Sequence, residues 1–103
     1  MVSYNVYFTP KDHIPESQAL ESVHLFMRDL DAKGMISSYR VLRVNEKVNF
    51  EELPRFHLIV DYLTQEQSAK TFNFLKEGEA MREPHKSLMS MTKEFKISFT
   101  EDV

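Results

Sequence analysis

His57 stands in the middle of an alternating segment and has polar neighbours at spacings that would share its face. Arg55 lies two residues before it and Asp61 four residues after it, and alternate residues of a strand point to the same side. Such neighbours would hold one imidazole tautomer and tune the histidine's pKa, which suits proton transfer near neutral pH. We therefore single out His57, although a hydrogen-bonded histidine with a purely structural role explains the same pattern.

Three more polar residues, Asn5, Tyr7 and Arg40, fall on segments that would bring them to the same surface. Tyr and His act as general acid and base within hydrogen-bond reach of a substrate, while Asn and Arg orient a carbonyl or a carboxylate. We predict that these residues bind a ligand together with His57. If the protein is an enzyme, we expect His57 and Tyr7 to be the catalytic pair. The alternative is a network that only satisfies a buried surface.

A second set of candidates is apolar. The chain contains six Met and eight Phe, and methionine fills irregular space and adapts to varied apolar ligands. We expect an apolar cleft for a small amphipathic molecule, fatty-acid-like or polyketide-like. Its predicted lining is Met27, Phe72, Met81 and Met89. An ordinary hydrophobic core explains the same residues.

Composition removes several classes of function. Cysteine is absent, so no disulfide, thiolate metal site or iron–sulfur cluster is possible. The four histidines lack the His-x-x-x-His spacing of a helical metal site, and we expect neither a metal nor another cofactor. The formal net charge of −3 argues against nucleic acid as a partner, because such binding rests on neutralising phosphates. With Gly34 and Gly78 as its only glycines, the chain has no glycine-rich nucleotide loop.

Targeting signals are also missing from the sequence. The first five residues lack a basic stretch followed by an apolar run, so we expect no signal peptide. No run approaches the ~20 apolar residues that cross a bilayer. We expect a cytoplasmic protein that does not bind membranes, with residues 1–103 forming a single domain.

Period-two alternation of apolar and polar residues predicts three strands. They span residues 2–9, 55–63 and 93–100. Residues 35–44 predict a fourth strand that is apolar on both sides, which indicates cover on both faces at one end at least.

The helical period predicts two main helices. Residues 15–33 form the first, with Gly34 as its C-cap. Its apolar stripe comprises Ala19, Leu20, Val23, Phe26, Met27 and Leu30, and Leu25 lies off it. Thr64 and Gln67 form a capping box that opens the second helix, which would run to about residue 82. The inward side of that helix would be Ala69, Phe72 and Leu75.

The order of elements predicts an α+β domain with the ferredoxin-like βαββαβ topology, a four-stranded antiparallel sheet with two helices on one face. The helix side would carry Val2, Tyr4, Val6, Phe8, Phe56, Leu58, Val60, Tyr62, Phe95, Ile97 and Phe99. The other side would carry Ser3, Asn5, Tyr7, Thr9, Arg55, His57, Ile59, Asp61, Leu63 and Ser98. This mixture suits neither water nor a core, and we expect a second copy to enclose it. A solvated face is the alternative.

The element order, the chain length and the segment His85-Lys86-Ser87-Leu88-Met89 before the last strand resemble the dimeric α+β barrel superfamily. That superfamily includes small monooxygenases of antibiotic biosynthesis, stress-responsive barrel proteins and many uncharacterised bacterial members. The resemblance implies a homodimer with a ligand cleft in each protomer, and its monooxygenases need no metal or flavin. We favour a homodimeric small-molecule-binding protein. The alternatives are a cofactor-independent monooxygenase or cyclase using His57 and Tyr7, and a structural or regulatory dimer without a ligand.

Overall fold

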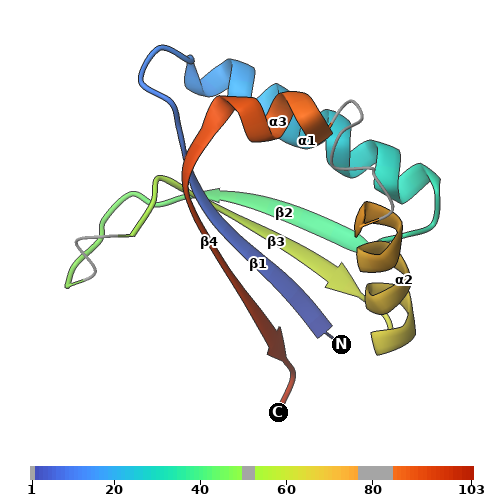
Figure 1. The fold of residues 1–103 in the computed structure, drawn as a ribbon. Helices are drawn as coiled ribbons and strands as arrows, with labels where there is room; N and C mark the ends of the chain where they lie inside the picture. Colours follow the sequence, from blue (N-terminus) through green and yellow to red (C-terminus); the bar gives the residue numbers. More distant parts are fainter. Residues whose placement is uncertain (1, 50–52, 77–84) are drawn as a thin grey trace.

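The structure is a computed structural model that describes residues 2–49, 53–76 and 85–103. Its elements are β1 (Val2–Pro10), α1 (Glu16–Ala32), β2 (Ser38–Arg43), β3 (Phe56–Tyr62), α2 (Gln65–Lys76), α3 (His85–Met91) and β4 (Thr92–Glu101). The strands pair antiparallel in the order β2-β3-β1-β4. The helices lie on one side of this sheet, α1 and α3 beside each other and α2 near the end of β3 (Figure 1). The predicted ferredoxin-like fold is confirmed.

α1 forms where the helical period predicts it and ends at Ala32, with Lys33 as its C-cap and Gly34, the predicted C-cap, one residue further on. The Gly34 N–H donates to the Asp31 carbonyl at 2.9 Å and the Met35 N–H donates to the Leu30 carbonyl at 3.0 Å. This pair of bonds is a Schellman motif, which needs a positive φ after the last helical turn. Gly34 supplies a φ of 70°, and the chain can then turn directly into β2.

The core lies between α1 and the two central strands. Phe56, Leu58, Val60 and Tyr62 of β3 are all buried, while the residues between them are only half-buried. Val6 and Phe8 of β1 lie beside them in register, and Val23, Phe26, Met27 and Leu30 of α1 cover them together with Leu88 of α3. The predicted stripe of α1 is therefore the face that packs on the sheet.

The apolar residues of β4 differ from the prediction. Ile97 pairs with Val6 and Phe99 with Tyr4, so both lie on the helix side as expected. They are nevertheless 58% and 57% exposed, because β4 is an edge strand that the helices leave largely uncovered. The prediction that Ile97 and Phe99 belong to the core was therefore wrong, although both lie on the predicted face of the sheet.

β2 is the other edge strand, and the cover expected on both of its faces is not supplied by the described residues of this chain. The strand is shorter than the predicted 35–44. Leu42 is exposed, as is Val48 in the connection that follows.

The side of α2 that faces the sheet is only partly the predicted one. Phe72 packs on Tyr4 and Tyr62 as expected, whereas Ala69 is exposed and Ser68 and Thr71 are buried instead. The Thr71 hydroxyl lies within hydrogen-bond distance of the Met35 carbonyl, and such a bond anchors a buried polar group. The side chain of Leu75 and the predicted helix end near residue 82 lie outside the described residues.

The capping box at the start of α2 is confirmed in half of its bonds. The Thr64 hydroxyl oxygen accepts the Gln67 N–H at 3.1 Å. The Gln67 side-chain oxygen accepts the Leu63 N–H at 2.8 Å and the Ser37 hydroxyl at 3.0 Å. Gln67 therefore ties the helix start to the loop between α1 and β2.

Among the described residues, no helix is long and apolar enough to span a membrane.

Two leucines of α1 offer a matched test of this packing. Leu30 is 2% exposed and Leu25 is 51% exposed. Leu30→Ala leaves a cavity in the core and is expected to lower the free energy of unfolding by about 2–5 kcal/mol. Leu25→Ala is expected to change it by less than about 0.5 kcal/mol. Urea denaturation measures both, and equal losses would contradict the assignment of the buried face.

Candidate functional site

The face of the sheet away from the helices gathers the polar candidates, and we call it the open face. Register places Tyr7 opposite His57 and Asn5 opposite Ile59, while Arg40 lies opposite Ile59 from the other side. The open face comprises Ser3, Asn5, Tyr7, Ser38, Arg40, Leu42, His57, Ile59, Asp61, Lys96, Ser98 and Thr100. The structure therefore brings together the four predicted polar residues on three adjacent strands.

His57 is held by two neighbours from β1. Its ring stacks on Tyr7 with centroids 4.1 Å apart and planes 18° from parallel. Its Nε2 lies 3.0 Å from the Asn5 side-chain oxygen, and the Asn5 amide nitrogen donates to the Thr100 hydroxyl at 3.0 Å. Because the amide nitrogen is committed to Thr100, the oxygen is left to accept from His57. This assigns the proton of neutral His57 to Nε2 and leaves the lone pair on Nδ1.

The surroundings of His57 keep its imidazole neutral. Burial lowers the His57 pKa below its ordinary value, and the positive charge of Arg40 lowers it further. The Nδ1 atom has no hydrogen-bond partner among the described residues. A neutral imidazole with one nitrogen held and the other unoccupied can accept a hydrogen bond or a proton from a bound molecule.

Asp61 does not partner His57, contrary to the prediction. Its carboxylate accepts the Ser3 hydroxyl at 2.6 Å and the Ser38 hydroxyl at 3.2 Å. These bonds satisfy the carboxylate at the far end of the open face. Asp61 therefore joins the three strands and leaves His57 to Asn5.

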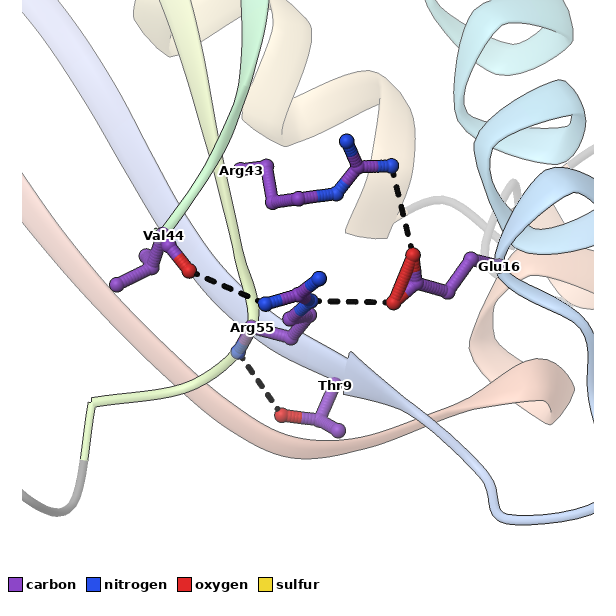
Figure 2. A network of polar contacts seen from close by, with 5 residues as sticks. All are labelled: Thr9, Glu16, Arg43, Val44 and Arg55. Carbon is purple, nitrogen blue, oxygen red and sulfur yellow. Dashed lines mark hydrogen bonds and ion pairs between the residues drawn. The ribbon is translucent and has the colours of Figure 1, made fainter. Parts of the chain in front are cut away.

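Arg55 also departs from its predicted place beside His57. Its Nε donates to Glu16 at 3.1 Å and its Nη1 donates to the Val44 carbonyl at 3.3 Å, so the side chain turns toward the start of α1 (Figure 2). Its backbone N–H donates to the Thr9 hydroxyl at 3.1 Å. Arg55 precedes β3, and the alternation that was expected to fix its direction does not extend to it.

Thr100 is the member of the site that the sequence did not single out. It holds the Asn5 amide from the edge strand β4. It lies 95 positions away in the chain, and only the register of β1 with β4 brings the two side chains together. In the sequence, only the position of Thr100 on the polar side of the alternating segment 93–100 indicated that it could lie on this face.

The apolar candidates lie on the helix side of the sheet. Met27 and Met89 line a cavity of about 70 Å³ between the sheet and the helices, a volume that would hold about two water molecules. Phe72 instead packs edge-on against Tyr4, with ring centroids 5.0 Å apart, and Met81 lies outside the described residues. The sheet separates this cavity from His57. The described residues of one chain therefore form no single cleft that joins the two predicted sets.

The described residues contain no cluster of side chains that could hold a metal ion. No group of three or more His, Asp or Glu side chains in residues 2–49, 53–73 and 88–103 is arranged to hold an ion. The site on the open face is built from hydrogen bonds, with the cationic residues Arg40 and Lys96 on the same face, and Arg40 is the one whose charge lowers the His57 pKa.

Solved structures share this fold. A protein of Arabidopsis thaliana, At3g17210, matches with a TM-score of 0.76 at 7% identity, over 100% of this chain and 96% of that chain. A dimeric protein of unknown function and ferredoxin-like fold from Bacteroides fragilis matches with a TM-score of 0.55 at 17% identity, over 98% and 95%. A dimeric ferredoxin-like protein from an uncultured marine organism matches with a TM-score of 0.54 at 16% identity, over 96% and 91%.

At these identities the likeness shows that the chain is a ferredoxin-like α+β protein. More narrowly, it belongs to the family of unknown function DUF6614, which it matches over residues 1–102. No curated protein matches the chain.

The electrostatics of His57 can be tested directly. An NMR titration of its imidazole is expected to give a midpoint below the ordinary value of 6.5. Arg40→Gln removes a repelling charge and should move the midpoint upward. Arg43→Gln, on the helix side of the same strand, should leave it unchanged. An upward shift with Arg43→Gln alone would refute the placement of Arg40.

The lowered pKa also sets the direction of a stability change. The unfolded chain takes up the His57 proton as the pH falls through 6.5, whereas the folded chain takes it up only at lower pH. Stability from this group is therefore full above pH 6.5 and falls below it. His57→Gln, which keeps a donor for Asn5, should lose less stability than the natural chain between pH 7 and 5.

Proposed function

We propose that two copies of this chain pack with their open faces together and that the enclosed His57 site binds a small organic molecule. The observation that carries the proposal is the neutral imidazole of His57, with Nε2 held by Asn5 at 3.0 Å and Nδ1 directed to no described residue. A nitrogen prepared in this way suits a ligand that donates a hydrogen bond.

The open face has features that favour a covering partner. Asn5 is only 7% exposed in the single chain, and Ile59 lies beside it in register. Leu42 on β2 and Leu63 just after β3 are exposed, and they would lose contact with water against a second copy. Two of the solved relatives are described as dimeric. A face-to-face dimer would make the site an enclosed one.

The chemistry of the site points to the class of ligand. A phenol or an enol keeps its hydroxyl proton near neutral pH and can donate it in a hydrogen bond to Nδ1 of His57. A carboxylate has no proton to donate and would pair with the Arg40 guanidinium instead. Ile59 and the face of Tyr7 supply apolar contact. A polyketide-like molecule with its phenol or enol at His57 meets these conditions, whereas a fatty-acid-like molecule would depend on Arg40.

A cofactor-independent enzyme of the monooxygenase or cyclase type is the second candidate. The lowered pKa of His57 favours it, because an unprotonated imidazole at neutral pH can remove a proton from a substrate. Tyr7, stacked on His57 with ring centroids 4.1 Å apart, would be its partner in proton transfer, as the acid–base chemistry of the two residue types predicts. Whether proton transfer follows binding separates the two candidates.

The dimer is tested by analytical ultracentrifugation. The natural chain is expected at twice its mass of 12.2 kDa. Ile59→Lys puts a charge at the centre of the open face and should yield monomers. Ile97→Lys makes the same change on the helix side of β4 and should leave the dimer intact. A natural chain that stays monomeric at high concentration would contradict the proposal.

Ligand binding is tested by thermal shift and NMR with 4-pentylphenol, which has a hydroxyl donor, and with decanoate, a carboxylate that has none. We expect the phenol to raise the melting temperature more than decanoate, because a ligand that binds only the folded state stabilises it. His57→Ala should abolish the shift. His24→Ala, which removes a histidine on the helix side, should retain it.

The outcomes separate the candidates. Binding without conversion supports the binding protein, whereas conversion that both His57→Ala and Tyr7→Phe abolish supports the enzyme. No shift with any compound of either class would leave the structural dimer as the remaining hypothesis and would refute the ligand site.

A further inference from the structure

A groove on the helix side of the sheet lies between α1 and β2, away from the open face. Its volume is about 250 Å³, below the range of about 300–1,000 Å³ that is typical of drug-sized ligands. The groove is lined by Leu20, His24, Val41, Arg43 and Phe56. It is therefore sized for a small molecule, and its walls combine apolar side chains with a cation and an imidazole.

Among the described residues, the charges at one end of the groove are unbalanced. In that part of the chain a single carboxylate, Glu16, faces both Arg43 and Arg55 (Figure 2). Arg55 is the better held of the two, because Glu16 accepts from it at 3.1 Å and the Val44 carbonyl at 3.3 Å. Arg43 reaches Glu16 only at 3.4 Å, beyond the roughly 2.7–2.9 Å of a strong charged hydrogen bond. One guanidinium charge thus exceeds the neutralising capacity of Glu16.

Arg43 is also positioned by an aromatic contact. Its guanidinium carbon lies 5.6 Å from the centre of the Phe56 ring, within the range of a cation–π interaction. Phe56 is fully buried and forms the floor under the side chain. The remaining guanidinium donors of Arg43 have no partner among the described residues, so a planar anion could accept from them.

His24 supplies a second donor from α1. Its Nδ1 lies 2.7 Å from the Tyr39 hydroxyl, and the other ring nitrogen has no partner among the described residues. If the phenol donates to Nδ1, the proton of a neutral imidazole is on Nε2. An anion in the groove favours the tautomer of His24 with the proton on Nε2, because that nitrogen can then donate a hydrogen bond to the anion.

We propose that this groove binds a small carboxylate with an apolar body. The forked N–H groups of Arg43 donate to the carboxylate, and Nε2 of His24 donates to it as well. The apolar body lies against Leu20 and Val41, which are partly buried beside the core. The inference is independent of the proposed dimer, since packing through the open face leaves the helix side accessible.

Benzoate is a suitable probe, and NMR titration of the full chain is the measurement. Saturable shifts are expected at Leu20, His24 and Val41. Benzamide has nearly the same shape without the charge and should bind at least about tenfold more weakly, because hydrogen bonds to charged groups contribute more than neutral ones. Inorganic phosphate, which has no apolar body, should also bind more weakly than benzoate.

Variants of Arg43 test its guanidinium, and a lysine outside both proposed sites gives the control. Arg43→Gln should weaken benzoate binding by about tenfold or more, and Arg43→Lys should retain part of the affinity, because it keeps the charge without the fork. Lys70→Gln removes a positive charge from the exposed surface of α2 and should change the affinity by less than about twofold. Circular dichroism confirms that each variant is folded.

Specific results would overturn the proposal. Shifts confined to His57 and loss of binding with Arg40→Gln would place the carboxylate on the open face instead. Equal affinity for benzoate and benzamide would show that the negative charge of the ligand does not contribute to binding. If Arg43→Gln binds benzoate with unchanged affinity, the guanidinium of Arg43 does not hold the carboxylate.

Discussion

The register between β1 and β3 is the constraint on which the rest of the molecule depends. Val6 faces Leu58 and Phe8 faces Phe56 on the helix side, while Tyr7 faces His57 on the other. A slip of one residue would exchange the two faces, burying His57 and exposing the Phe56 ring. The cost of exposing that apolar set to water holds the register. The same cost therefore fixes the stacking of His57 on Tyr7.

The bond between Asn5 and His57 connects this register to chemistry. Asn5 is nearly excluded from water and has both ends of its amide bonded, to His57 and to Thr100. A buried amide that lost one of these partners would be destabilised by about 1–3 kcal/mol. The network thus links His57 of β3 through Asn5 of β1 to Thr100 of β4 and holds the imidazole ring in one orientation. Because burial and Arg40 disfavour the imidazolium, what the network fixes is a neutral ring with one nitrogen left for a ligand.

The sequence predicts those parts of the structure in which periodicity and burial agree. β3 and α1 are such parts, because their apolar residues face one core. The buried side of α2 was only partly predicted, since Thr71 is buried through a bond to a carbonyl that hydrophobicity does not signal. β4 has the expected face without the expected burial, because an edge position follows from the packing of distant elements. The link from Asn5 to Thr100 needed the strand register, and the turn of Arg55 toward Glu16 needed the position of α1.

The sheet divides the molecule into two chemical environments, and β2 contributes a cation to each. Arg40 and Arg43 lie three positions apart in β2, and an odd offset places them on opposite faces of the strand. Arg40 lies near enough to His57 to lower its pKa, whereas Arg43 lies over Phe56 and exceeds what Glu16 can neutralise. The first cation thus keeps a base neutral, and the second keeps a groove positive. Because a layer of core side chains and backbone separates them, a ligand at one site need not disturb the other.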